Sequence, residues 1–364
     1  MLIRGETIAA VGSRGSVELP DGTGTLDCSG LTITAAFWNS HVHFFERKWA
    51  NAAAIPAPEL GRQLQDTFTR YGFTSAFDLS SFWGNTRRIR DRIESGEVPG
   101  PRIRSTGEGL VPPGAMPTEQ VLDVMGVMAT PLPEITDAAQ AAAASRKLLD
   151  AGVDGIKLFA SSPRGALLPG GAIQAAVNEA HRAGKPVFVH PNTGADVLAA
   201  LRGGVDVIAH TTPRSGRWDE AILTAMKEQR AALTPTLALW KYFLRHDRLS
   251  IQENLVETAA GQLRAWVGAG GTVLFGTDLG AVDPDPSEEY TLMGEAGMSF
   301  REILGSLTTA PAERFGDSAR LGRIAPGLQA DLVVLKRDPS KDVRALADVR
   351  YTLRAGRIVY PAGA

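Results

Sequence analysis

The chain has 364 residues, of which 44% are hydrophobic, and a formal net charge of -2 at pH 7. This length and composition allow one large hydrophobic core with a smaller unit beside it. The near balance of charges argues against nucleic acid and against an acidic membrane surface as partners. We therefore expect a globular protein that acts on a small molecule.

Cys28 is the single cysteine, so no disulfide forms within the chain and a reducing cytoplasm is the expected location. Residues Met1–Gly12 include Arg4 and Glu6 and lack a long apolar core, so they do not resemble a signal peptide. No apolar run reaches the ~20 residues that a membrane-spanning helix needs. We expect no membrane association.

The two ends of the chain share a β pattern. Short strands separated by turns are expected in residues 1–28, and apolar strands recur in Ala330–Lys336 and Val349–Tyr360. Each end alone buries little. We therefore predict that residues 1–30 and 320–364 together form a small β-sandwich domain.

The middle of the chain, residues 31–319, alternates between apolar strands and amphipathic helices. One strand, Leu31–Thr34, leads into His41. The other seven expected strands are Thr74–Asp78, Arg102–Thr106, Gly155–Phe159, Val187–His190, Val207–His210, Ala232–Thr236 and Thr272–Gly276. The expected helices are Glu59–Tyr71, Thr86–Ser95, Asp137–Ala151, Ile173–Ala183, Asp196–Leu201, Asp219–Gln229 and Asn254–Ala269. Eight strands alternating with helices favour an α/β fold of the (β/α)8 TIM-barrel type. The long loop Gly107–Pro133 has the length to cover a site.

Two histidines, His41 and His43, stand where the first of these strands ends. Side chains two residues apart on a strand point to the same side, so both imidazoles can reach one point. Such a pair is a good start for a metal site. An isolated His-x-His is also compatible with two half-buried residues on an edge strand, so the rest of the chain has to decide.

Further metal-ligand residue types lie at other expected strand ends. His190 and His210 end two strands, so four of the six histidines stand at strand ends, and only His181 and His246 do not. Asp278 follows the last apolar strand. In a barrel, the carboxyl ends of the strands meet at one face, so we predict a metal site there.

The acidic residues at strand ends are interpreted differently from one another. Asp278 leaves an apolar strand where a ligand and a base are needed, because a carboxylate beside a metal ion can take a proton and later deliver it to a leaving group. Asp78 and Asp206 are interpreted as structural residues, acting as caps or salt-bridge partners.

Lys157 lies inside the apolar strand Gly155–Phe159, where burying an ammonium group is costly. It either pairs with a nearby acid or reacts with CO2 to give an anionic carboxylate that bridges two metal ions. With four histidines close by, we favour the carboxylated form.

These motifs together resemble the amidohydrolase superfamily over nearly the whole chain. The resemblance rests on Phe37–His43, on Gly-Ile before Lys157, on His190 and His210, on Gly-Thr before Asp278, and on the return segment Gly322–Leu332. Within the superfamily the chain is most similar to imidazolonepropionase-related and prolidase-like hydrolases.

The resemblance implies a binuclear centre of two divalent ions, with zinc favoured and manganese, iron or cobalt also compatible. By the family pattern, His41, His43 and Asp278 hold the more buried ion, His190 and His210 hold the more exposed one, and carboxylated Lys157 bridges them. A metal-bound hydroxide then attacks the substrate while Asp278 shuttles the proton.

Two features depart from the family pattern. Ala35-Ala36 stands where family members usually carry Pro-Gly, and the amino-terminal β segment is shorter than usual. A missing strand leaves a sheet edge that a second subunit can cover, so we expect a homo-oligomer.

Aromatic residues near the expected strand ends are candidates for the substrate pocket: Trp38, Phe44, Phe45, Trp49, Phe82, Trp83, Phe159, Trp240 and Tyr290. They suit a flat, fairly apolar substrate. Arg164, Arg214 and Arg217 lie in loops and are interpreted as solvated, with binding of an anionic group as the alternative.

The leading functional hypothesis is hydrolysis of an amide or other C–N bond, outside ordinary peptide bonds, in a small aromatic or cyclic substrate. A second hypothesis is hydrolytic displacement of a nitro, chloro or amino substituent from a heteroaromatic ring. A third is a non-catalytic, amidohydrolase-like assembly protein, which would be marked by missing metal ligands.

Overall fold

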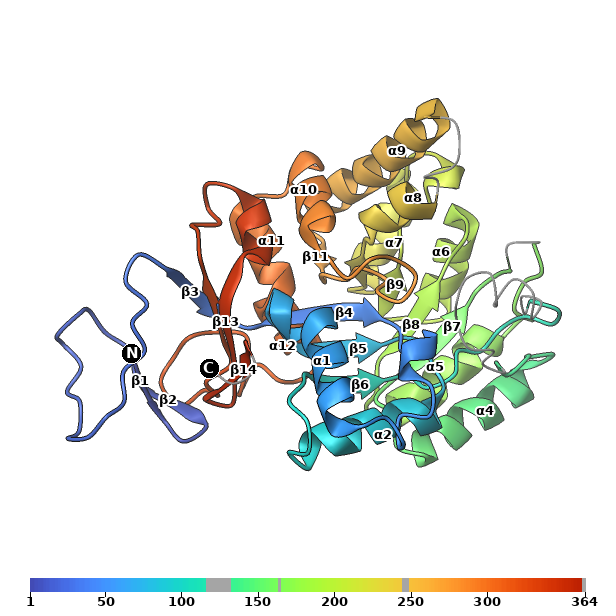
Figure 1. Ribbon diagram of the computed structural model, residues 1–364. Helices are drawn as coiled ribbons and strands as arrows, with labels where there is room; N and C mark the ends of the chain where they lie inside the picture. The colour runs from blue at the N-terminus through green and yellow to red at the C-terminus, as the bar shows by residue number, and fades with distance from the viewer. Residues whose placement is uncertain (116–131, 163–164, 244–248, 362–364) are drawn as a thin grey trace.

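Two parallel sheets form the centre of the computed structural model, which describes residues 1–115, 132–162, 165–243 and 249–361 (Figure 1). The first sheet has the order β4-β5-β6, and its strands are β4 (Phe37–Val42), β5 (Phe73–Asp78) and β6 (Arg102–Ser105). The second has the order β11-β10-β9-β8-β7, and its strands are β7 (Ile156–Phe159), β8 (Val187–His190), β9 (Val207–Ala209), β10 (Ala232–Thr234) and β11 (Thr272–Val273). Seven of the eight strands, β5 to β11, lie close to the ranges expected from the sequence.

Main-chain hydrogen bonds join the two sheets at both pairs of edges. After β6, the amide of Leu110 donates to the carbonyl of Lys157 in β7 (2.9 Å), and the amide of Phe159 donates back to Leu110 (2.9 Å). At the other edge, the amide of Ser40 in β4 donates to the carbonyl of Phe275 (2.7 Å). The carboxyl ends of strands from both sheets are thereby brought to one face. Residues 116–131, the middle of the long loop after β6, lie outside the described residues.

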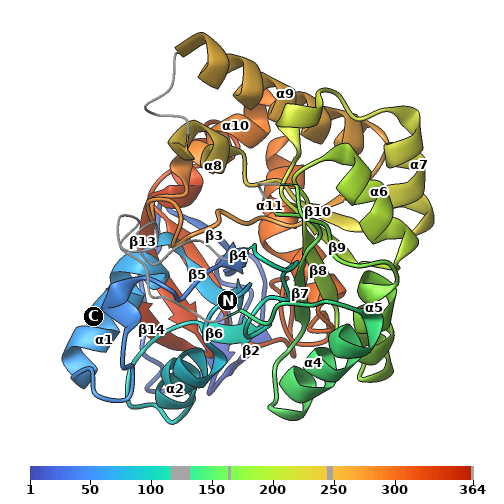
Figure 2. The same cartoon turned by 90° about the vertical axis from the view of Figure 1, so that its right-hand side faces the viewer.

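Helices lie outside the strands, as the view toward the carboxyl ends of the strands shows (Figure 2). They are α1 (Ala57–Thr67), α2 (Trp83–Glu94), α4 (Ala138–Asp150), α5 (Ala172–Arg182), α6 (Gly194–Arg202), α7 (Glu220–Glu228), α8 (Leu237–Phe243), α9 (Leu249–Gly268), α10 (Ser287–Glu295), α11 (Phe300–Leu307) and α12 (Thr309–Arg314). Single 3-10 turns are η1 (Arg47–Trp49), η2 (Thr69–Tyr71), η3 (Pro213–Ser215) and η4 (Val343–Ala347). None of the described helices combines the length and the apolar character that crossing a bilayer requires.

Short helices are where the sequence pattern was least informative. We expect no helix from the pattern over α8 or over α10 to α12, because six to nine residues give too few turns for a clear apolar repeat. One signal was present: Ser299 and Glu302 form a capping box that starts α11. The expected longer helices are present, and each begins and ends within a few residues of its expected range.

Aromatic side chains fill the space between the strands. Trp38, Phe77 and Phe188 come from three different strands and belong to one buried cluster with Phe315, which follows α12. The ring of Phe315 lies 5.4 Å from Trp38 and 4.9 Å from Phe77. This apolar layer packs like a core, so polar chemistry is left to the strand ends.

Both ends of the chain contribute to a second β unit on the amino-terminal side of β4 to β6 (Figure 1). Strands β1 (Leu2–Arg4) and β2 (Thr7–Ala10) pair with each other, and an antiparallel sheet has the order β14-β13-β12-β3. Its strands are β3 (Thr32–Ala35), β12 (Leu332–Leu335), β13 (Val349–Arg354) and β14 (Arg357–Tyr360). The amide of Ile8 donates to the carbonyl of Leu328 (2.8 Å), which ties the amino-terminal hairpin to the carboxyl-terminal segment.

One expectation about the first strand was wrong. The strand predicted at Leu31–Thr34 does not carry the histidines, because β3 pairs antiparallel with β12 in the terminal sheet and β4 is a separate strand. The chain changes partners within one residue: the amide of Ala36 donates to Asp331 (2.9 Å), and the amide of Phe37 donates to Gly72 (3.0 Å). No turn residues mark this change, so the sequence reads as one continuous run. The terminal sheet therefore extends to residue 35.

Candidate metal centre

Six titratable side chains gather at the carboxyl ends of the parallel strands. His41 lies in β4 and His43 follows it, Lys157 lies in β7, and His190 ends β8. His210 follows β9, and Asp278 follows β11. Five of the six are buried, and His190 is partly exposed. The structure brings together the residues that the sequence predicted as metal ligands.

Asp278 is the centre of this group. Its Oδ1 lies 3.0 Å from Nε2 of His41 and 2.7 Å from Nε2 of His43. One possible ligand atom each from His41, His210 and Asp278 lies within 4.8 Å of the others. The ring of His210 is 4.6 Å from that of His190. Several nitrogen and oxygen ligands therefore face one small volume.

Close backbone approach holds β4 against the segment that carries Asp278. A Cβ added to Gly276 would lie 2.4 Å from Cγ2 of Thr234 and 2.7 Å from Cβ of His41, so only glycine fits there. Asn39 joins the same two segments: its Nδ2 donates to Oγ1 of Thr277 (2.8 Å), and its Oδ1 accepts from the amide of Thr277 (3.2 Å). These contacts place Asp278 beside the two histidines of β4.

Four non-glycine residues at the strand ends have left-handed backbone conformations: Ser80 (φ 85°), His210 (φ 95°), Thr236 (φ 46°) and Asp278 (φ 61°). Residues other than glycine rarely adopt positive φ, and such strain concentrates at functional sites. Two of the four, His210 and Asp278, are predicted metal ligands.

Burial keeps His41, His190 and His210 neutral. It lowers the pKa of His41 to about 3 and that of His190 to about 4, and it lowers the pKa of His210 well below its usual value. Burial also acts to raise the pKa of Asp278, but the neighbouring His41 and His43 outweigh it and hold that pKa well below the usual range. Neutral imidazoles and an ionised carboxylate are the forms that bind metal ions.

Lys157 is 1% exposed, and its Nζ has no hydrogen-bond partner among the described residues. Burial lowers its pKa to about 7, opposed in part by the charge of Asp278. Nδ1 of His41 and Nδ1 of His43 also lack hydrogen-bond partners among the described residues. Buried polar atoms are normally paired. This group of unpaired ligand atoms fits divalent metal ions held jointly by the residues present.

Two aromatic rings flank the cluster. Phe45 stacks on His43 with ring centroids 4.5 Å apart, and Phe159 lies 5.1 Å from the ring of His190. Both side chains are partly exposed. Trp240 is also partly exposed, and its Nε1 donates to Oγ1 of Thr211 (2.9 Å). Phe45 and Phe159 thus lie beside two of the predicted ligands, and Trp240 is bonded to the neighbour of a third, His210.

Most of the other aromatic residues predicted as substrate contacts are buried. Trp38, Phe44 and Tyr290 are at most 2% exposed and pack in the hydrophobic core, which argues against contact with substrate. Trp83 is buried, and its Nε1 donates to the carbonyl of Ala151 (3.0 Å) after α4. The remaining two are Phe82, which is 47% exposed, and Trp49, which is fully buried. Hydrophobicity alone does not separate a pocket wall from a core.

Asp206 and Asp78, interpreted from the sequence as structural residues, form hydrogen bonds with neighbouring segments of the fold. Asp206 accepts hydrogen bonds from Nε2 of His181 (2.8 Å) and from the amide of Val187 (2.8 Å), away from the cluster. Asp78 is buried and accepts from the hydroxyls of Ser81 and Ser105. Arg214 and Arg217 are exposed, and Arg164 lies outside the described residues.

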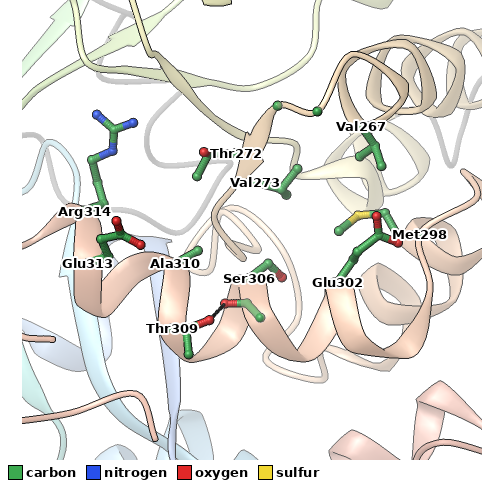
Figure 3. Close-up of a pocket in the computed structure, with 13 residues that line it drawn as sticks. Val267, Thr272, Val273, Met298, Glu302, Ser306, Thr309, Ala310, Glu313 and Arg314 are labelled. Carbon is green, nitrogen blue, oxygen red and sulfur yellow. Dashed lines mark hydrogen bonds between the residues drawn. The ribbon is translucent and has the colours of Figure 1, made fainter.

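A cavity of about 500 Å³ opens next to the cluster. It reaches Thr277, the neighbour of Asp278, and is also lined by Ala238, Lys241, Val282 and Glu289. A second cavity of about 590 Å³ lies at the other end of the strands, between Gly271 at the start of β11 and Ser306 of α11 (Figure 3). Of these two cavities, the first lies on the side of the strands where Asp278 stands.

Some residues that shape the site were not predicted from the sequence. Asn39 and Thr277 connect two strand ends, and Thr236 bonds the ring of His210. All three are common polar residues in or beside apolar strands. Nothing in their local sequence marks such partners, which lie 26 to 238 residues away.

Known proteins resemble this chain over nearly its whole length. The sequence model of the amidohydrolase family matches residues 32–359. Ochratoxinase from Aspergillus niger is 24% identical over an alignment of 400 positions, gaps included. The alignment covers 98% of this chain and 82% of that protein.

Two solved structures are similar as well. A Xaa-Pro dipeptidase with methionine bound in its active site has a TM-score of 0.83 at 22% identity, covering 98% of this chain and 93% of that one. A prolidase in complex with N-methylphosphonate-L-proline has a TM-score of 0.77 at 28% identity, with the same coverage. Together these matches indicate a TIM-barrel-type α/β fold, and they support hydrolase activity on amide or other C–N bonds. Because the family match spans most of the sequence, the chain belongs to the amidohydrolase family.

Proposed function

We propose that this protein is a metal-dependent hydrolase that cleaves an amide or other C–N bond of a small aromatic or cyclic substrate. The observation that carries the proposal is the shared Oδ1 of Asp278, within 3.0 Å of Nε2 of both His41 and His43, in a cluster that also contains His190 and His210. The same cluster contains the buried, unpaired amine of Lys157. All six predicted ligands are present, which argues against a non-catalytic assembly protein.

The proposal includes a closed (β/α)8 barrel with a terminal β-sandwich. Hydrogen bonds at both pairs of sheet edges support closure, and the pairing of residues from both chain ends supports the terminal domain. A closed barrel holds residues from distant parts of the sequence in fixed relative positions. That rigidity suits a site assembled from several strands.

The metal ions would be held by the six clustered residues. We propose two divalent ions, zinc by preference, with His41, His43 and Asp278 on one ion and His190 and His210 on the other. Lys157 would bridge them after carboxylation by CO2, for which its lowered pKa and unpaired Nζ provide a neutral, nucleophilic amine. When bound, such ions supply Lewis acidity that lowers the pKa of water and polarises a carbonyl group.

Proton transfer is assigned to Asp278. Its pKa lies well below the usual range, so it is a carboxylate at neutral pH and can accept a proton from the attacking water. The same carboxyl group can then donate that proton to the departing nitrogen. Its two histidine neighbours fix the position of the acceptor oxygen.

The preferred substrate follows from the walls of the site. Phe45 and Phe159 present partly exposed rings beside His43 and His190, which favours a flat apolar group next to the scissile bond. The likeness to ochratoxinase and to a prolidase that binds a proline phosphonate supports a small C–N substrate. We propose an N-acyl amino acid, aryl amide or lactam over an ordinary peptide.

The test is a hydrolysis screen on the purified protein with its bound metal quantified. The panel contains N-acyl amino acids, lactams, Xaa-Pro dipeptides and heteroaromatic rings with nitro, chloro or amino substituents. Release of a carboxylate and an amine from an amide, with about two metal equivalents per chain, supports the proposal. Release of nitrite, chloride or ammonia from a ring instead supports the displacement chemistry, to which the flat aromatic walls are also suited. A metal-loaded protein inactive on every class contradicts both.

We also propose a homo-oligomer. Met1, Val11, Leu19 and Leu26, in or beside the terminal β unit, are each 40 to 51% exposed. Exposed apolar side chains gathered in one segment favour association. Light scattering at micromolar concentration tests this directly, and a mass of 38.7 kDa, the mass of one chain, contradicts it.

A further inference from the structure

The side chain of Thr236 forms a hydrogen bond with Nδ1 of the His210 ring. Nδ1 of His210 lies 2.8 Å from Oγ1 of Thr236, in the turn after β10. The threonine hydroxyl has one proton, which it donates to the carbonyl of Pro235 (2.9 Å). Toward His210 the hydroxyl oxygen therefore acts as an acceptor, and Nδ1 is the nitrogen that carries the hydrogen. Nε2 is left unprotonated for a metal ion.

Thr236 itself needs support. Its φ is 46°, in the left-handed region that a β-branched residue rarely adopts. The two amides that follow it, those of Leu237 and Ala238, donate to Oε1 and Oε2 of Glu289 at 2.9 and 2.7 Å. Both carboxylate oxygens are thus used to hold the turn in this conformation.

Glu289 is buried, although glutamate side chains usually lie at the protein surface. It is fully buried at the start of α10, and the ion pairs formed by the described residues include none with Glu289. The neighbouring Glu288 pairs instead with Lys241. Burial raises the pKa of Glu289 to about 7. Burying a carboxyl group costs free energy unless it is hydrogen-bonded, and Glu289 meets that cost by accepting from the two amides of this turn.

We propose that Thr236 is a positioning residue that fixes His210 in the tautomer with hydrogen on Nδ1, and that Glu289 keeps Thr236 in place. Neither side chain would touch the metal ions. The inference rests on the proposed function, because it assigns His210 as a ligand through Nε2. It adds a chain of contacts from α10, through the turn after β10, to the metal centre.

The first test reads the tautomer directly. In metal-free protein labelled with ¹⁵N-histidine, long-range ¹H–¹⁵N spectra distinguish the two neutral tautomers, and the His210→Gln variant assigns the signal. We expect wild-type His210 to carry its hydrogen on Nδ1, and Thr236→Val to shift the population toward the other tautomer. Thr236→Ser keeps the hydroxyl and should keep the wild-type tautomer. A wild-type signal with hydrogen on Nε2 would overturn the inference, whatever the variants do.

The second test measures metal affinity by competition of Zn²⁺ with a chromophoric chelator. Loss of an outer hydrogen bond to a ligating histidine weakens metal binding by about 10–100-fold. We expect that loss for Thr236→Val, a smaller loss for Glu289→Gln, and wild-type affinity for Thr236→Ser and for the neighbouring control Glu288→Gln. The absorption spectrum of the Co²⁺-loaded protein should change in the first two variants only.

The outcomes separate this inference from the proposed function. If Thr236→Val and Glu289→Gln bind Zn²⁺ as tightly as wild type, the positioning role is wrong while the hydrolase proposal stands. If wild type binds metal tightly and hydrolyses no substrate of the screen, the function fails and the positioning role is judged on affinity and tautomer alone. If wild type binds no Zn²⁺, both are wrong. Should Thr236→Val not fold, the wild-type tautomer and Glu289→Gln decide.

Discussion

Nε2 of His43 lies 2.7 Å from Oδ1 of Asp278, although the two residues are 235 positions apart in the sequence. The same oxygen lies 3.0 Å from Nε2 of His41. Two imidazoles and a carboxylate directed at one point, inside an apolar fold, are the side-chain types that hold divalent cations in proteins. The predictions below follow from this arrangement and from the contacts that maintain it.

Asp278→Asn should lower the rate of hydrolysis by about 10²–10⁴-fold, because the amide cannot accept the proton that the carboxylate takes. The measurement is the initial rate with saturating metal, on whichever substrate the screen identifies. Asp91→Asn is the matched control, since Asp91 is an exposed carboxylate on α2. Activity of Asp278→Asn within a few-fold of this control would exclude Asp278 as the proton-transfer group.

Lys157→Met should stabilise the metal-free protein at neutral pH, because it replaces a buried amine by an apolar side chain of similar size. Folding lowers the pKa of Lys157 from 10.5 to about 7, so between these values the unfolded chain binds more protons than the folded one. The cost of burying Lys157 is therefore full below pH 7 and disappears as the pH rises to 10.5, with a magnitude on the order of 5 kcal/mol.

The check is urea unfolding in chelator and bicarbonate-free buffer at several pH values. The difference in free energy of unfolding between Lys157→Met and wild type should shrink steadily from pH 7 to pH 10.5. A constant difference across this range would mean that Lys157 titrates normally. The same variant should also lose bound metal, since it lacks the bridging group.

Gly276→Ala should cost about 1–3 kcal/mol of stability, because the added methyl group overlaps Thr234 and His41. It should also weaken Zn²⁺ binding, since the backbone shift that relieves the overlap moves His41. Gly261→Ala is the control: Gly261 lies inside α9 with open space around its Cβ position. That substitution should stabilise the protein by about 0.5–1 kcal/mol through helix propensity. Equal effects of the two changes on metal affinity would contradict the packing argument.

Arg102→Ala should destabilise the protein by about 2 kcal/mol. Arg102 of β6 binds both carboxylate oxygens of Asp331, which is 5% exposed, and its removal leaves that carboxylate without its cation. Arg337→Ala breaks the exposed pairs with Asp342 and Asp348 and should cost less than about 1 kcal/mol. Thermal and urea unfolding measure both. Similar losses for the two variants would show that Arg102 contributes nothing special to joining the terminal β unit to β6.

The candidate site was predictable from the sequence because its residues stand at ends of apolar strands. His190, His210 and Asp278 each end or follow a run of β-branched and apolar residues, and parallel strands bring their carboxyl ends to one face. Lys157 was detectable for a related reason, since an amine inside an apolar strand conflicts with its surroundings. A local conflict of this kind marks function.

Other features depended on contacts that no local pattern encodes. The switch from β3 to β4 takes place across Ala36 with no turn signal, so the sequence cannot tell one strand from two. Phe159 and Phe44 are both aromatic residues near strand ends, yet Phe159 stands beside His190 while Phe44 lies in the core against Trp49.

The sequence by itself determined the alternation of the parallel strands with the longer helices, the family, and which side chains gather at the strand ends. It did so because strand period, helix caps and ligand types are local properties. Only the tertiary structure decided how each ligand is aimed, as when Thr236 sets the tautomer of His210 and Asn39 joins β4 to Thr277. Those contacts depend on distances of a few tenths of an ångström between segments far apart in the chain, and such distances arise only when the whole core packs.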